Sequence, residues 1–374
     1  MNPRLPALIR QTPLLLGPLA IVAAALHLSP PVVFGIAFVA LIPLAYLVGE
    51  ATETLAARAG PRIGGLLNAT FGTLTELIVM FALLRTGQTE LLKASIVGSI
   101  LISLLLTVGT AMLFGGIHNG VQRFDQQSVG LASTTMILAV VGLLIPTFFS
   151  FISQRQAHRL FSSAFQSESV DRISLAVAVI LFLLYILTVV YQLRAPEGEE
   201  LTRKRSGTPE LERPVWSTRR AIAILTAATI GIAVLGEIVS LVVTPFGASL
   251  GLSYLFVGIV ILPVAGAISE IIACVHMARS NMVNLAISIP MNGAMQISLF
   301  VAPILVFLSA FGPTPLTLGF GVAEVISVAI AVALAAYIAI DGITSWLEGA
   351  QLLALWGILA LYFFFYQPSP VPAL

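Results

Sequence analysis

An apolar segment that carries a single glutamate occurs twice in this chain, and no other feature restricts the fold as strongly. The first copy runs GLLNATFGTLTELIVMFALLRTG around Glu76, and the second runs IVILPVAGAISEIIACVHMARSN around Glu270. When the two glutamates are superposed, at an offset of 270 − 76 = 194 residues, Arg85 falls on Arg279. A carboxylate in the middle of a membrane helix costs about 2.5–3.5 kcal/mol on insertion scales. Two of them at matching points of a repeat indicate that both serve one task.

The composition indicates whether these segments lie in a membrane or in water. Of 374 residues, 58% are hydrophobic and 9% are charged, whereas a soluble domain carries about 25% charged residues. We therefore expect an integral membrane protein that lies almost entirely in the lipid bilayer. The formal net charge of +1 gives no reason to expect a nucleic-acid partner. The single cysteine, Cys274, excludes an intramolecular disulfide.

Apolar runs of about 20 residues can each span a bilayer as a helix, and they predict an all-α polytopic membrane protein with about eleven transmembrane helices. The predicted spans are Leu14–Leu28, Val32–Val48, Ile63–Leu84, Leu91–Gly116, Leu131–Phe149, Ser174–Leu193, Ala221–Val243, Tyr254–Met277, Leu285–Phe311, Val322–Ile340 and Trp346–Tyr366.

A long polar segment divides these spans into two halves. Residues 194–220 mix both charge signs with Pro and Gly and predict a cytoplasmic linker. Residues 32–193 and 221–374 then form two halves of five spans each, and residues 1–31 form an extra N-terminal helix. Because five is odd, the second half is inverted relative to the first. Inverted repeats are a transporter architecture, with the binding site near the midplane between them.

The distribution of basic residues predicts the orientation. Lys and Arg are more numerous in the segments on the same side as the N-terminus, and the linker holds the largest group. The positive-inside rule therefore places the N-terminus in the cytoplasm. Short loops and the preference for Arg over Lys favour a multi-pass protein of a bacterial inner (plasma) membrane.

Oxygen-bearing side chains surround both glutamates. Hard cations such as Ca²⁺ bind six to eight oxygens, carboxylates among them, and the sequence has no cluster of His or Cys for a softer metal. We predict a cation site with Glu76 and Glu270 as primary ligands. The further candidate ligands are Thr73, Thr75, Ser99, Ser269, Asn292 and Gln296.

The same pair of carboxylates suggests a mechanism. Two neighbouring carboxylates in a low dielectric repel each other and are poorly solvated. Without a bound cation, the two carboxylates should hold protons, and a divalent cation would displace these protons. The sequence therefore predicts exchange of Ca²⁺ or a similar cation for H⁺. No cofactor is expected. Glu50 and Glu237, which follow glycines in the spans before the acidic segments, are candidates for a proton route or cation entrance. Alternatively, they are interfacial charges that reach water.

Several motifs resemble a known family. NATFGTLTELIVMFALLRTG and KASIVGSIL resemble the first signature of the Ca²⁺/H⁺ antiporter family within the cation/Ca²⁺ exchanger superfamily, and LPVAGAISE and QISLFVAP resemble the second. The resemblance covers about Val32 to Tyr366. It implies eleven helices, a central site between two inverted repeats, and Ca²⁺ transport driven by protons. It also implies that Glu76 and Glu270 are essential, with Gln296 in the second repeat.

The chain departs from the family pattern beside both glutamates. Thr73 and Ala267 replace the usual Asn three residues before each glutamate, and Ile271 replaces a His. The second half-site is therefore poorer in ligands. Two alternatives remain. The protein exchanges another cation, namely Na⁺, K⁺, Mn²⁺ or Mg²⁺, or it is a divergent membrane protein that transports no ion. No enzyme is expected, because the His-Glu-x-x-His motif is absent from the sequence.

Overall fold

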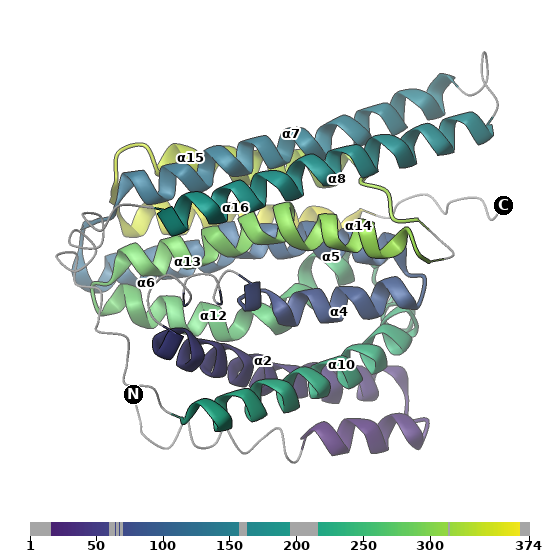
Figure 1. The fold of residues 1–374 in the computed structure, drawn as a ribbon, viewed down its shortest axis with the longest axis horizontal. Helices are drawn as coiled ribbons and strands as arrows, with labels where there is room; N and C mark the ends of the chain where they lie inside the picture. Colours follow the sequence, from purple (N-terminus) through teal and green to yellow (C-terminus); the bar gives the residue numbers. More distant parts are fainter. Residues whose placement is uncertain are drawn as a thin grey trace.

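The computed structural model describes residues 16–59, 64, 67, 70–156, 163–194, 216–312 and 315–366. Most of the predicted linker at 194–220 lies outside these residues. The described part is an all-α bundle whose helices run roughly along one common direction (Figure 1). The first half contains a short N-terminal helix at Leu16–Ala25, then α2 (Pro30–Ala59), α4 (Leu74–Arg85), α5 (Thr89–Leu101), η1 (Ile102–Thr107), α6 (Val108–Asn119), β1 (Gln122–Arg123), α7 (Gln126–Gln156) and α8 (Ser163–Arg194). The second half contains α10 (Thr218–Ser249), α11 (Tyr254–Phe256), η2 (Val257–Ile261), α12 (Leu262–Arg279), α13 (Val283–Gln296), η3 (Ile297–Val301), α14 (Ala302–Ser309), α15 (Val322–Ile338), β2 (Ile343–Thr344) and α16 (Trp346–Phe365).

Each of the eleven predicted spans has a helix within the described residues, but the helix of the third span, α4, begins only at Leu74. Eight helices are long and apolar enough to cross a membrane, and Leu16–Ala25 and Val322–Ile338 are shorter apolar helices. Helix α4 accounts for the remaining span. The protein is a multi-pass integral membrane protein whose two halves have the architecture of an inverted repeat.

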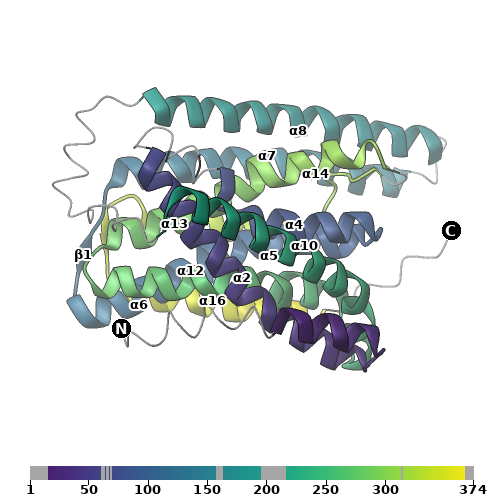
Figure 2. The same cartoon turned by 60° about the horizontal axis from the view of Figure 1, so that its bottom comes forward.

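The third span of the first half lies at the centre of the bundle. In the most apolar window of Thr89–Asn119, 83% of residues are buried inside the protein, compared with 28% in Ser169–Arg194. Helices α2 and α10 pack against each other on one side, and α7 and α8 form a hairpin on the other (Figure 1). Helix α8 lies at the edge of the bundle when the view is rotated (Figure 2). Lipid is thus expected to cover the outer helices, while α5, η1, α12 and α13 contact mainly protein.

Three π-helical turns interrupt the central spans. They are η1 (Ile102–Thr107), η2 (Val257–Ile261) and η3 (Ile297–Val301). Two of them correspond across the repeat, because residues 103–107 of η1 fall on 297–301 at the offset of 297 − 103 = 194. A π turn widens the helix and shifts its hydrogen-bond pattern, and such turns often occur at functional sites.

The two halves approach closely where α5 crosses η2. A Cβ built on Gly98 would overlap the backbone of Ile259, and one built on Gly258 would lie 2.5 Å from Cβ of Ala94. Glycines at both positions let the two backbones touch, as small residues do at helix interfaces in membranes. This contact fixes the position of the second half's acidic helix against the first half.

One expectation about the repeats is wrong. The sequence predicted a continuous apolar helix through Gly72 and Thr73, with Glu76 at its middle. The structure instead has a turn at these two residues, and α4 begins at Leu74. Gly and the β-branched Thr are poor helix formers, whereas the corresponding Gly266 and Ala267 lie within the continuous helix α12.

Candidate functional site

Glu76 lies in the first turn of α4 and contacts α12. Thr73 is the N-cap residue of this helix, and a Cβ built on Gly266 would lie 2.8 Å from Oε1 of Glu76. The carboxylate therefore occupies space that any side chain at position 266 would need. Its other oxygen, Oε2, is buried and has no hydrogen-bond partner among the described residues.

Glu270 lies one helical turn after Gly266 on the same face of α12, because residues four apart are neighbours on a helix. Its carboxylate approaches α13, where a Cβ built on Gly293 would lie 3.7 Å from Oε1 of Glu270 and 4.0 Å from Oγ of Ser103. Glu76 and Glu270 thus reach the same face of α12 about one turn apart. The structure brings the two repeat-related glutamates to one region at the interface of the halves.

A small cavity of about 20 Å³ lies beside Glu76. This volume is enough for one water-sized occupant. Its polar lining comes from α4 and α5, and the remaining lining is mostly apolar. The residues that line it are Phe38, Leu41, Thr75, Glu76, Val79, Met80, Ser95, Ser99, Leu262, Pro263, Ala265 and Gly266.

Some of the predicted secondary ligands line the cavity beside Glu76, and others do not. Thr75 and Ser99 line the cavity. Thr73 and Gln296 are buried, and Oγ1 of Thr73 and Oε1 of Gln296 have no hydrogen-bond partner within the described part of the chain. Ser269, by contrast, is half-buried, and its hydroxyl donates to the carbonyl of Gly266 at 3.5 Å.

Asn292 is half-buried on α13, next to Gly293. It does not line the cavity beside Glu76, and neither does Ser269. The structure therefore gives these two predicted ligands no direct contact with that cavity, and their roles stay predictions.

The candidates for an entrance lie outside the cavity. Glu237 of α10 is 3.9 Å from Nη1 of Arg85, and the two side chains are 39% and 63% exposed. Exposed pairs of this kind typically contribute about 0.2–1 kcal/mol. Glu50 is half-buried within α2, which continues beyond the predicted span Val32–Val48 to Ala59. A role of either residue in a proton route or cation entrance stays a prediction.

Ser95 was not among the candidate ligands predicted from the sequence. It is buried on α5, one turn before Ser99, and lines the cavity beside Glu76. The signal was available, because Ser95, Ser99 and Ser103 follow one another at four-residue intervals and so lie near one face of the helix.

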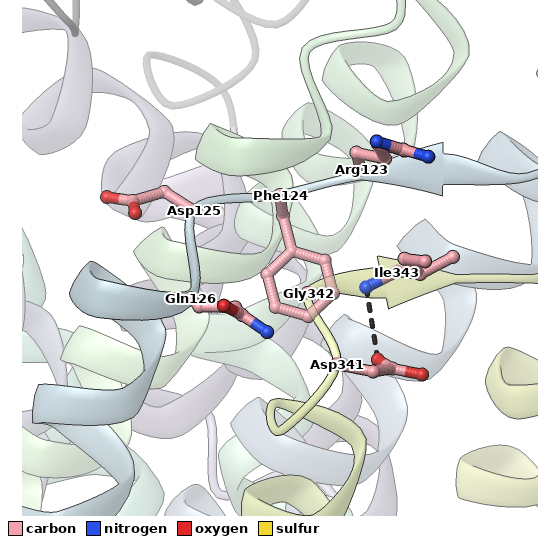
Figure 3. A pocket seen from close by; sticks show the side chains of 7 residues that line it. All are labelled: Arg123, Phe124, Asp125, Gln126, Asp341, Gly342 and Ile343. Atoms are coloured by element: carbon pink, nitrogen blue, oxygen red, sulfur yellow. Dashed lines mark hydrogen bonds between the residues drawn. The ribbon is translucent and has the colours of Figure 1, made fainter.

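The charge at the site comes from two carboxylates. Among the described residues, no three His, Cys, Asp or Glu side chains gather in a way that could hold a metal ion. A larger hollow of about 680 Å³ lies at the β1–β2 junction, where Asp125 and Asp341 point away from each other (Figure 3). There the carboxylate of Asp341 accepts a hydrogen bond from the backbone of Ile343 at 3.1 Å. This hollow is open and contains none of the residues predicted to bind cations.

The chain also contains a Gly-x-Ser-x-Gly spacing, from Gly247 to Gly251. In hydrolases this motif forms a turn between a strand and a helix that exposes the serine. Here Ser249 is the last residue of α10, and its hydroxyl donates to the carbonyl of Phe246 at 2.8 Å. The spacing therefore lacks the structural context of a nucleophile.

Comparison with known proteins identifies the family of the chain and agrees with its fold. Residues 29–194 and 220–365 match the sodium/calcium exchanger protein family. The chain is 35% identical over 368 residues to a Ca(2+)/H(+) antiporter of Aphanothece halophytica, a match that covers 96% of each chain. It is also 35% identical over 348 residues to the Ca(2+)/H(+) antiporter ChaA of Bacillus subtilis (strain 168), covering 93% of this chain and 96% of the relative. The solved structure of native YfkE superposes with a TM-score of 0.77 at 32% identity, over 94% of this chain and 97% of that one. The family matches both halves and the relatives span nearly the whole chain, so this protein belongs to the sodium/calcium exchanger protein family.

Proposed function

We propose that this protein is a secondary active antiporter that exchanges Ca²⁺ for H⁺ across a membrane. The names of the relatives support this activity, since those from Aphanothece halophytica and Bacillus subtilis are both Ca(2+)/H(+) antiporters. The observation within the chain that carries the proposal is the contact of Glu76 with Gly266, one turn from Glu270 on α12.

The chemistry of this pair suits the exchange. Ca²⁺ prefers hard oxygen ligands, and two carboxylates balance its double charge. Two protons balance the same carboxylates, so the pair binds either one Ca²⁺ or two protons and stays neutral within the membrane. Burying both carboxylates without such compensation would be costly. Competition for the same oxygens then couples the two ion flows.

Further oxygen atoms are available near the carboxylates. A buried polar atom without a partner costs about 1–3 kcal/mol, and such atoms are rare in folded proteins. Oε2 of Glu76, Oγ1 of Thr73 and Oε1 of Gln296 are atoms of this kind. A cation that accepts oxygen ligands would satisfy them, and we propose Thr73, Thr75, Ser99 and Gln296 as secondary ligands, with Ser269 and Asn292 as weaker candidates.

We further propose that the protein lies in a bacterial inner membrane with its N-terminus in the cytoplasm. The excess of Lys and Arg on the N-terminal side and in the 194–220 linker supports this orientation. Uphill Ca²⁺ transport would then run from the cytoplasm outward, driven by protons that enter.

The decisive test is ⁴⁵Ca²⁺ uptake into everted vesicles or proteoliposomes with an imposed proton gradient. Glu76→Gln and Glu270→Gln keep the side-chain shape but can no longer carry a negative charge, so we expect uptake to be abolished while the protein remains folded. Asp341→Asn, at the exposed β1–β2 hollow, should transport normally. Normal uptake by either glutamine variant would refute the proposal.

Ion choice needs its own measurement, because Ala267 and Ile271 add no oxygen beside Glu270. Uptake should be compared for Ca²⁺, Mn²⁺, Mg²⁺, Na⁺ and K⁺, each with a proton gradient and with a sodium gradient. We expect Ca²⁺ uptake that depends on the proton gradient. Faster transport of another cation would reassign the substrate but leave the paired glutamates in place.

A further inference from the structure

Thr107 is a buried threonine whose hydroxyl lacks the hydrogen bond that helical threonines usually make to the preceding turn. Several buried helical hydroxyls donate to a carbonyl of the preceding turn, as Ser133 does to Val129 at 2.9 Å and Thr147 to Leu143 at 2.8 Å. Thr107 is fully buried, yet its Oγ1 has no hydrogen-bond partner among the described residues. It is the last residue of η1, whose π-helical turn differs from the α-helical turn in which that hydrogen bond usually forms.

The packing of α6 on α12 shows which part of the bundle Thr107 faces. A Cβ built on Gly115 would lie 2.8 Å from Cβ of Ala278, and Ala111 and Cys274 belong to one buried cluster. Both pairs differ by 163 residues (278 − 115 and 274 − 111), so the two helices run side by side in the same direction. One turn earlier, the same difference pairs Thr107 with Glu270.

The faces of the helix agree with this pairing. Thr107 and Ala111 lie four residues apart and therefore on one face, which is the face that contacts α12. Gly109 lies on the opposite face, where a Cβ would be 3.1 Å from the carbonyl oxygen of Gly349 on α16. One turn before Thr107, Ser103 already shares the neighbourhood of Gly293 with the carboxylate of Glu270.

We propose that the Thr107 hydroxyl is an additional oxygen ligand for the cation held by Glu270. This inference rests on the proposed function. A hydroxyl oxygen has lone pairs that can bind a cation. It can therefore join the carboxylate of Glu270 around a bound cation. Thr107 supplies the polar group that neither Ala267 nor Ile271 can offer beside Glu270.

The test compares Thr107→Val, which keeps the shape and loses the hydroxyl, with Thr107→Ser, which keeps the hydroxyl. Thr135→Val is the matched control, because Thr135 is a buried helical threonine of α7 that donates to Leu131 at 2.8 Å, far along the chain from the site. Ca²⁺ affinity is measured from the Ca²⁺-dependent rise in melting temperature of purified protein, and the KM for Ca²⁺ from uptake into proteoliposomes.

We expect Thr107→Val to weaken Ca²⁺ affinity and raise KM about tenfold, the factor that corresponds to ~1.4 kcal/mol. Thr107→Ser should stay within about twofold of the wild type, and Thr135→Val should bind Ca²⁺ normally. The melting temperature without Ca²⁺ should not fall in Thr107→Val, because this hydroxyl makes no hydrogen bond to any of the described residues. A drop in that temperature with unchanged Ca²⁺ affinity would assign Thr107 a structural role and overturn the inference.

Wild-type affinity in Thr107→Val would also overturn it. If this variant does not fold, Thr107→Ala compared with Thr107→Ser decides the question by the same readout. Failure of the proposed function looks different: wild-type protein would then show neither Ca²⁺ stabilisation nor Ca²⁺ uptake. Loss of binding in Glu270→Gln together with normal binding in Thr107→Val would refute the role of Thr107 alone.

Discussion

At the scale of single residues, Gly266 sets how closely α12 can approach Glu76. A methyl group there would lie 2.8 Å from Oε1 of Glu76, which is too close, so the carboxylate would have to move. Misplacing a functional group by about 1 Å can cost 10²-fold in rate. We predict that Gly266→Ala lowers proton-driven Ca²⁺ uptake by about 10- to 100-fold while the protein still folds.

The matched control for that change is Gly357→Ala on α16, where a new Cβ would meet nothing within 4 Å. It should leave uptake unchanged. Equal uptake by Gly266→Ala and Gly357→Ala would mean that the position of the Glu76 carboxylate does not limit transport.

Candidate site residues could be predicted where their type is unusual for their position in the sequence. Acidic residues in apolar segments are costly and therefore conspicuous, and Glu76 and Glu270 were singled out in this way. The structure brings both to one face of α12, and their role as cation ligands stays a prediction. Thr107 was not among the ligands predicted from the sequence, because a threonine in an apolar helix usually satisfies its own hydroxyl by bonding to the preceding turn. The inference that it lies level with Glu270 depends on the register of α6 against α12.

At the scale of elements, the crossing of α5 and η2 depends on glycines that allow backbone contact. A Cβ on Gly98 would overlap the backbone of Ile259, which cannot rotate away as a side chain can. Overpacking of this kind costs about 1–3 kcal/mol. We predict that Gly98→Ala lowers the melting temperature of the purified protein, measured by circular dichroism in detergent.

Gly130→Ala on α7 is the control for this prediction, since nothing lies within 4 Å of a Cβ built there. Replacing a helical glycine by alanine at such a position should keep or raise stability. If Gly98→Ala melts at the same temperature as Gly130→Ala, the two halves do not depend on this contact.

The helices themselves were largely predictable, because about 20 apolar residues in succession can form little else in a bilayer. Predicted and observed spans agree closely for Tyr254–Arg279 and Trp346–Phe365. The π turns were not predictable, since a change from one hydrogen-bond pattern to another leaves no clear mark in an apolar sequence. The turn at Gly72 and Thr73 was missed for another reason: the apolar run continues through it, although both residues form helices poorly.

At the scale of the whole molecule, contacts between the two halves form at both ends of the bundle. At one end, β1 pairs with β2, and the side chain of Gln122 donates to the carbonyl of Ala278 at 3.0 Å. At the other end, the side chain of Gln88 donates to the carbonyl of Ser240 and accepts from Thr244 at 2.7 Å. Each end of the bundle therefore holds segments from both halves, as an inverted repeat with an odd number of spans requires.

This arrangement makes a prediction about sidedness that single cysteines can test. The background variant Cys274→Ala removes the one native cysteine, which is fully buried. Val121→Cys and Asp341→Cys then report the β1–β2 end, and Phe311→Cys reports the opposite end; Val121 and Phe311 are 69% and 92% exposed. A membrane-impermeant maleimide should label the first two only in everted vesicles and Phe311→Cys only in right-side-out vesicles.

If both groups label from the same side, the inverted arrangement of the halves is wrong. If each labels from the side opposite to the one expected, the fold stands and only the cytoplasmic placement of the N-terminus is refuted.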